Sequence, residues 1–178
     1  GSLFHAPDMY MKKLVVNAAA AGAISLELTL AENLRNVART LGKSLEHLRM
    51  VTLDKPRLQD AIAEATRLGV KVFALPDGDV AASVLTCLPD NPYDLMYTIG
   101  GAPEGVISAC AVKALGGDMQ AELIDFCAAK GESPENRSIA MHEHRRCAEM
   151  GVEINRIYTL NELVEGNDIL FSATGVTG

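Results

Sequence analysis

Short apolar segments alternate with helical patterns in the middle of the chain, and this alternation limits the possible folds more than any other feature. Strands are predicted at residues 48–53, 70–75 and 95–99. Helical patterns follow them at residues 56–68, 80–88 and 102–115, with Gly, Pro or Asp at the junctions. Nearly continuous apolar strands are typical of burial on both faces. The sequence therefore predicts an α/β fold with a mainly parallel sheet flanked by helices.

The flanking regions predict further elements of the same kind. A helix is predicted at residues 26–41, with Thr29 as a possible N-cap, and a charged helix at 135–150. Additional strands are predicted at 121–126, 154–159 and 168–172. We expect residues 3–178 to form a single α/β lobe, and Gly1-Ser2 to be a cloning remnant.

Composition excludes several classes of partner. The 178 residues carry a formal net charge of −7 and no block of Lys or Arg, so we expect no binding to nucleic acid or to an anionic membrane. No apolar run approaches the ~20 residues of a membrane span. The cysteines lie far apart and form no CxxC pair, which disfavours a zinc site and favours reduced thiols in the cytoplasm.

A glycine-rich turn joins the strand at 95–99 to the next helix. Gly100 and Gly101 allow positive φ angles and close approach of a ligand, and Pro103 suits the first helical turn. Helix N-termini favour anions, but Glu104 beside a phosphate would repel it unless a cation lay between them. The turn thus predicts a site for phosphate and metal. A plain strand-to-helix connection remains the alternative.

The loops after the other two strands also carry polar side chains. Lys55 and Arg57 flank Pro56, and this basic pair fits a phosphate clamp; a solvated pair at a helix start is the alternative. Asp77 and Asp79 fit sugar hydroxyls or a hard cation; the alternative is a turn in which Asp79 caps the helix beginning at 80. Because parallel strands direct such loops to one edge of the sheet, we expect them to converge on one small molecule.

The order of these motifs resembles a known family. The resemblance lies in residues 5–11, 55–57, 76–83, 100–106 and 171–175. On these residues the chain resembles the class II fructose-1,6-bisphosphatases, the bacterial branch of the lithium-sensitive sugar phosphatase superfamily. The segment would then be the carboxy-terminal lobe of a sugar-phosphatase fold.

The resemblance implies an activity and a set of site residues. The activity is hydrolysis of fructose 1,6-bisphosphate to fructose 6-phosphate and phosphate, a step of gluconeogenesis, with Mg²⁺ or Mn²⁺ as cofactor. It implies that Glu104 binds the metal, and that the complete protein is a homo-oligomer. The residues implied to contact the sugar bisphosphate are Tyr10, Lys55, Pro56, Arg57, Asp77, Gly78, Asp79 and Gly101.

The sequence departs from the family pattern in its extent. Family members carry an amino-terminal half that supplies the other metal-binding Asp and Glu residues and a threonine that helps to activate water. Relatives also continue beyond Gly178. We therefore expect a fragment with no catalytic residue of its own and little or no turnover in isolation. A sugar-phosphate-binding or oligomerisation module is the alternative; a Rossmann nucleotide domain is disfavoured because GxGxxG is missing.

Overall fold

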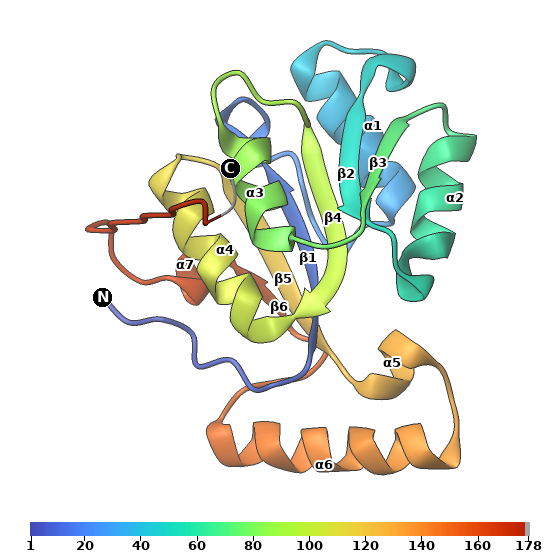
Figure 1. Cartoon of the computed structure of the whole chain (residues 1–178), viewed down its shortest axis with the longest axis vertical. Helices are drawn as coiled ribbons and strands as arrows, with labels where there is room; N and C mark the ends of the chain where they lie inside the picture. The colour runs from blue at the N-terminus through green and yellow to red at the C-terminus, as the bar shows by residue number, and fades with distance from the viewer. Residues whose placement is uncertain (177–178) are drawn as a thin grey trace.

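A six-stranded mixed sheet lies between two layers of helices in the computed structural model, which describes residues 1–176 (Figure 1). The predicted lobe, 3–178, thus includes two residues outside the described part. The strands are β1 (Tyr10–Val16), β2 (Arg49–Leu53), β3 (Lys71–Leu75), β4 (Leu95–Gly101), β5 (Asp118–Ile124) and β6 (Ile157–Thr159). The α-helices are α1 (Leu30–Leu41), α2 (Gln59–Arg67), α3 (Asp79–Cys87), α4 (Ala102–Ala114), α5 (Phe126–Lys130), α6 (Pro134–Met150) and α7 (Leu160–Leu163).

The sheet has the strand order β3-β2-β4-β1-β5-β6. Strands β3, β2 and β4 pair in parallel, as the alternating sequence pattern predicted. Strand β1 is antiparallel to β4 and β5, and β6 is antiparallel to β5. Strands β2 to β5 therefore point the same way, while β1 and β6 run against them. The α/β class is confirmed, and the sheet is mixed.

Strand β1 was not recognised from the sequence, although it occupies a central position in the sheet. Tyr10 lies opposite Gly101 of β4, and Val16 lies opposite Leu95. Two consecutive lysines interrupt the apolar pattern of this strand, and they conceal its burial. Lys13 is fully buried, whereas Lys12, on the opposite face, is partly exposed. Pairing with β4 and β5 places the beginning of β1 beside the glycine turn.

Helices cover both faces of the sheet with separate apolar clusters. On one face, Ala82 of α3 and Val112 of α4 pack with Met11 and Val15 of β1. On the other face, α1 and α2 pack against Leu14, Met50 and Leu95. Strand β3 is an edge strand and is largely exposed, because it has a neighbour on one side only. The expectation of burial on both faces is therefore wrong for this strand.

Helix boundaries follow local capping signals with some corrections. Thr29 caps α1 through a capping box with Glu32, as predicted, although residues 26–28 form a turn before the helix. Helix α3 begins at Asp79, one residue early, with Gly78 as N-cap at φ 95°. The alternative in which the Asp79 side chain caps this helix is therefore wrong.

The carboxy-terminal part of the chain departs more from the predictions. Strand β5 ends at Ile124, and Phe126 begins the short helix α5 instead of ending a strand. Residues 168–172 form no strand. Helix α6, predicted at 135–150, begins one residue earlier at Pro134, and it lies across the end of the sheet together with α5 (Figure 1). None of the helices within residues 1–176 has the length and apolar character needed to cross a membrane.

Candidate functional site

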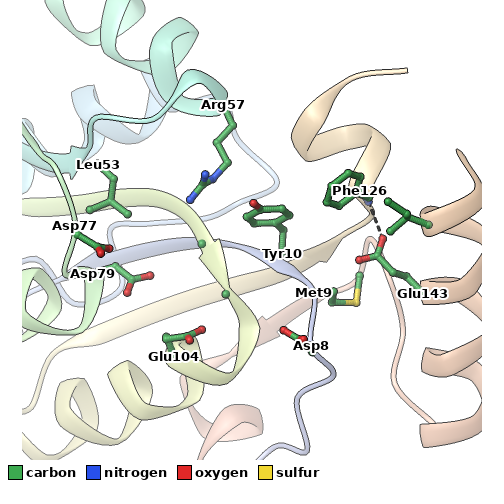
Figure 2. A pocket seen from close by; sticks show the side chains of 13 residues that line it. Asp8, Met9, Tyr10, Leu53, Arg57, Asp77, Asp79, Glu104, Phe126 and Glu143 are labelled. Atoms are coloured by element: carbon green, nitrogen blue, oxygen red, sulfur yellow. Dashed lines mark hydrogen bonds between the residues drawn. The ribbon is translucent and has the colours of Figure 1, made fainter. Parts of the chain in front are cut away.

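A pocket of about 480 Å³ opens where β2, β3 and β4 end and β1 begins (Figure 2). The three parallel strands bring their following loops to this edge of the sheet, as the sequence predicted. Helices α5 and α6 form the opposite wall. The lining residues are Asp8, Met9, Tyr10, Leu53, Arg57, Asp77, Asp79, Gly100, Gly101, Glu104, Phe126, Ile139 and Glu143.

The glycine turn contributes space at the pocket. Gly101 is extended, with φ −63° and ψ 139°, and Gly100 has no positive φ either, so the expected left-handed backbone is absent from this turn. A Cβ on Gly101 would collide with the Glu104 carboxylate, and a Cβ on Gly100 would lie 2.6 Å from Asp79 Oδ2. At both glycines an acidic side chain packs directly over the backbone, so an added side chain would have to displace it.

Glu104 lies in the first turn of α4, next to Pro103. Glu104 is exposed and lines the pocket, and within residues 1–176 its carboxylate makes no hydrogen bond to the protein. An exposed carboxylate without a protein partner is chemically suited to bind a divalent cation. No group of three or more His, Cys, Asp or Glu residues in the described part of the chain could hold a metal. Within the described residues, Glu104 thus fits the chemistry of a single metal ligand but does not make a complete metal site.

Asp79 is held by a buried lysine. Lys13 Nζ donates a hydrogen bond of 2.6 Å to Asp79 Oδ2, and the lysine side chain is 0% exposed while that of Asp79 is 12% exposed. Burial lowers the pKa of Lys13, while Asp79 and, more weakly, Glu104 oppose this shift. The pair therefore fixes one carboxylate at the pocket wall.

Arg57 and Tyr10 form the other side of the pocket. Arg57 Nε donates a 2.6 Å hydrogen bond to the carbonyl oxygen of Ile99, and the guanidinium lies 4.8 Å from the centre of the Tyr10 ring. The Lys130 ammonium lies 5.5 Å from the centre of the same ring. The backbone contact orients the guanidinium, and its remaining N–H groups are suited to bind an anion.

The other predicted contact residues divide into two groups. Asp77 lines the pocket, and its Oδ1 accepts a hydrogen bond from the Gly78 N–H. Lys55, Pro56 and Gly78 do not line the pocket; Lys55 is only partly exposed and precedes the 3₁₀ turn Pro56–Leu58. The structure therefore brings together Tyr10, Arg57, Asp77, Asp79, Gly101 and Glu104 from the predicted set.

Several residues at the site were not assigned a role from the sequence. Lys13 lies beneath the pocket, and Asp8, Phe126 and Glu143 line it. Glu143 Oε1 accepts a 2.7 Å hydrogen bond from the Phe126 N–H, and burial raises the pKa of Glu143 (Figure 2). The sequence offered one indication that Lys13 has a role, namely that a lysine interrupts an otherwise apolar strand. Glu143 could not be singled out, because the charged pattern of α6 is the same as that of any solvent-exposed helix.

Acidic groups predominate around the pocket. Five carboxylates line it, whereas Arg57 is the only Lys or Arg side chain among the lining residues. Such a pocket would repel a phosphorylated ligand unless cations offset the charge. Arg57, which lines the pocket, and Lys13, buried beneath it, offset part of this charge.

Comparison with known proteins agrees with this chemistry. The family model described as "Bacterial fructose-1,6-bisphosphatase, glpX-encoded" matches residues 1–178. The chain is 79% identical over 177 residues to fructose-1,6-bisphosphatase 2 class 2 of Escherichia coli K12, which covers 99% of the chain and 55% of that protein. It is 53% identical to the class 2 enzyme of Haemophilus influenzae, over 97% of the chain and 52% of that protein.

A more distant relative carries a name with two activities. The chain is 39% identical over 183 residues to the D-fructose 1,6-bisphosphatase class 2/sedoheptulose 1,7-bisphosphatase of Synechococcus elongatus, covering 99% of the chain and 51% of that protein. The chain spans about half the length of the curated relatives it matches. On the match of the family model over its whole length, the chain belongs to the bacterial fructose-1,6-bisphosphatase family.

Proposed function

We propose that this chain supplies the substrate-binding part of a metal-dependent phosphatase that hydrolyses fructose 1,6-bisphosphate to fructose 6-phosphate and phosphate. The observation that carries the proposal is the pocket itself. One oriented guanidinium, one helix N-terminus and several carboxylates surround a space of about 480 Å³ at the edge of the sheet. The family membership and the names of the relatives support the same reaction.

The chain's own residues would bind the two ends of the substrate differently. Arg57, with Lys55 nearby, would hold the phosphate that is not cleaved, and Tyr10 would pack against the sugar. Asp77 and Asp79 would accept hydrogen bonds from sugar hydroxyls, because ionised carboxylates are acceptors only. The backbone beside Gly101 would hold the phosphate that is cleaved, with the Glu104 N–H as donor, because the Ala102 N–H already donates to the carbonyl oxygen of Met9 and Pro103 has no N–H.

Glu104 would hold a divalent cation, Mg²⁺ or Mn²⁺, beside the cleaved phosphate. When bound, the cation would neutralise phosphate charge and activate water. Glu104 alone does not complete such a site, so the remaining ligands would come from the part of the complete protein outside this chain. Its carboxylate lies in the first turn of α4, close to the backbone that would hold the cleaved phosphate, and a cation between the two would relieve their repulsion.

The direct test is phosphate release by the complete protein that contains this chain. With Mg²⁺ or Mn²⁺, we expect hydrolysis of fructose 1,6-bisphosphate and no hydrolysis of fructose 6-phosphate. Sedoheptulose 1,7-bisphosphate is the informative second substrate, because the name of the Synechococcus relative includes it. Absence of turnover with both bisphosphates would contradict the proposal.

A module that binds sugar phosphates without turnover is the second candidate for this chain by itself. It is favoured by the observation that the described residues contain no group of three or more metal-ligating side chains. Binding of fructose 6-phosphate without phosphate release from the bisphosphate would support it.

We further propose that the complete enzyme acts in gluconeogenesis in the cytoplasm as a homo-oligomer, and that its partners are sugar bisphosphates, with neither nucleic acid nor membrane among them.

A further inference from the structure

We propose that Lys13 is a positioning residue of this site: it holds the Asp79 carboxylate in the one orientation that binds the sugar. This inference rests on the proposed function, because it assigns a task within the same pocket. Its basis is the contact of 2.6 Å between Lys13 Nζ and Asp79 Oδ2, beneath a pocket that Asp79 itself lines.

Two glycines, Gly100 and Gly105, leave room for the buried Lys13 side chain. A Cβ on Gly105 of α4 would lie 3.0 Å from Lys13 Cε and would also collide with Met11. A Cβ on Gly100 would lie 3.5 Å from Lys13 Nζ. Glycines on both α4 and β4 therefore leave room for the lysine stem and its ammonium group. The side chain reaches Asp79 through a passage that any larger residue at these positions would narrow.

The cost of burying Lys13 argues that the contact has a purpose. A buried ammonium loses its hydration, and within the described residues its Nζ makes one side-chain hydrogen bond, to Asp79. Replacing both partners of a buried ion pair by uncharged residues is often neutral or stabilising, and the neighbours Met11 and Val15 on the same face of β1 are apolar and fully buried. The retained charge is explained if Asp79 must stay fixed and compensated.

The charges at the pocket also favour a role for Lys13 in holding the Asp79 carboxylate. Asp79 faces a space that, on the proposed function, receives an anionic sugar phosphate. Without Lys13, this carboxylate would be uncompensated and free to rotate, and it would repel the ligand as well as bind it. With Lys13, one carboxylate oxygen is engaged and the other, Oδ1, stays available for a sugar hydroxyl.

Lys13→Met tests the inference with a matched control. Lys12→Met removes a lysine from the neighbouring position of β1, which faces away from Asp79. In titrations of the chain by calorimetry or chemical-shift mapping, we expect Lys13→Met to weaken fructose 6-phosphate binding about tenfold and inorganic phosphate binding by no more than about twofold. In the complete enzyme, KM should rise by a similar factor. Lys12→Met should change neither.

A double variant separates positioning from a direct or merely structural role. If Lys13 acts through Asp79, its removal should matter little once Asp79 is neutral. Lys13→Met/Asp79→Asn should therefore bind fructose 6-phosphate within about twofold of Asp79→Asn, and should melt at a higher temperature than either single variant. This comparison remains informative even if Lys13→Met alone does not fold.

Each possible result supports or contradicts the inference. Equal binding by the wild-type chain and folded Lys13→Met would overturn it, as would a double variant much weaker than Asp79→Asn. Equal loss of inorganic phosphate and fructose 6-phosphate would assign Lys13 to general anion attraction instead. Failure of the wild-type chain to bind fructose 6-phosphate, together with no turnover by the complete protein, would reject the proposed function itself.

Discussion

Glu104 combines two effects that a single substitution can separate. As a charged residue in the first turn of α4 it stabilises the helix by interaction with the macrodipole, and as an exposed carboxylate it is available to a cation. In the complete enzyme, we expect Glu104→Gln to change the free energy of unfolding by only about 0.3–1 kcal/mol. Phosphate release should nevertheless fall at least a hundredfold, an order-of-magnitude expectation for loss of a metal ligand.

Metal titrations show whether this loss has the expected cause. Added Mn²⁺ should restore only part of the activity of Glu104→Gln, because the missing ligand weakens the site. Asp77→Asn is the comparison, since Asp77 also lines the pocket. Normal turnover and metal dependence in Glu104→Gln, with both lost in Asp77→Asn, would move the metal ligand to the acidic loop.

The glycine at position 101 is explained by the Glu104 carboxylate packed over it and not by its own backbone angles. Its φ of −63° is accessible to any residue, but an added Cβ would collide with the Glu104 carboxylate. That carboxylate is the far end of a flexible side chain, so Gly101→Ala should keep the melting temperature nearly unchanged. We expect it to displace Glu104 and to raise the Mn²⁺ concentration needed for half-maximal activity. A lower melting temperature with unchanged metal dependence would contradict this explanation.

On the proposed function, Arg57 and Lys55 hold the phosphate that is not cleaved. Replacing both with Ala should abolish measurable binding of fructose 6-phosphate, because each charge-assisted hydrogen bond contributes about 1.5–3 kcal/mol. The single variants should differ, since Arg57 lines the pocket and Lys55 does not. Calorimetry on the two single variants and the double variant measures this. Unchanged binding in the double variant would make the pair a solvated feature of the helix start.

At the scale of elements, Asp94 joins the starts of β2 and β4. Its Oδ2 accepts a 2.8 Å hydrogen bond from the Arg49 N–H, and its Oδ1 contacts Lys43 Nζ at 2.8 Å. Burial by itself would raise the pKa of Asp94, but the hydrogen bonds from Lys43 and Arg49 outweigh it and hold the pKa below its usual value. The carboxylate thus stabilises the parallel half of the sheet.

The depressed pKa fixes the direction of the pH dependence. Stability from Asp94 is fully present above the unfolded pKa of about 3.9 and is lost as the pH falls through the lower folded value. At pH 7 we expect Asp94→Asn to lower the free energy of unfolding by about 1.5–3 kcal/mol. Urea denaturation should show this difference shrinking below about pH 4. Asp90→Asn, at an exposed position, is the control and should leave the free energy of unfolding at pH 7 nearly unchanged.

At the scale of the whole molecule, the chain spans about half the length of its curated relatives. Its described residues include Glu104, the metal ligand proposed above, and no group of three or more metal-ligating side chains. We therefore expect the isolated chain to release no phosphate from fructose 1,6-bisphosphate with Mg²⁺ or Mn²⁺, while still binding fructose 6-phosphate weakly. Turnover at the level of a complete enzyme, unaffected by Glu104→Ala, would contradict the role proposed for Glu104.

The sequence by itself determined the features that depend on local pattern and spacing. The three parallel strands, their helices and the Thr29 cap follow from apolar periodicity and from capping residues. Because the carboxyl ends of parallel strands meet at one edge, the sequence also predicted that the basic loop, the acidic loop and the glycine turn would converge, although Lys55 of the basic loop does not line the pocket.

Tertiary structure decided the features that depend on contacts between distant segments. Strand β1 exists because β4 and β5 pair with it on both sides, although two lysines obscure its pattern. Asp79 reads as a cap in sequence, but Lys13, 66 residues away, pairs with it and Gly78 takes the N-cap position. Gly101 is explained by the position of Glu104 and not by a left-handed turn. Local propensity does not encode such long-range pairings, so only the folded chain shows them.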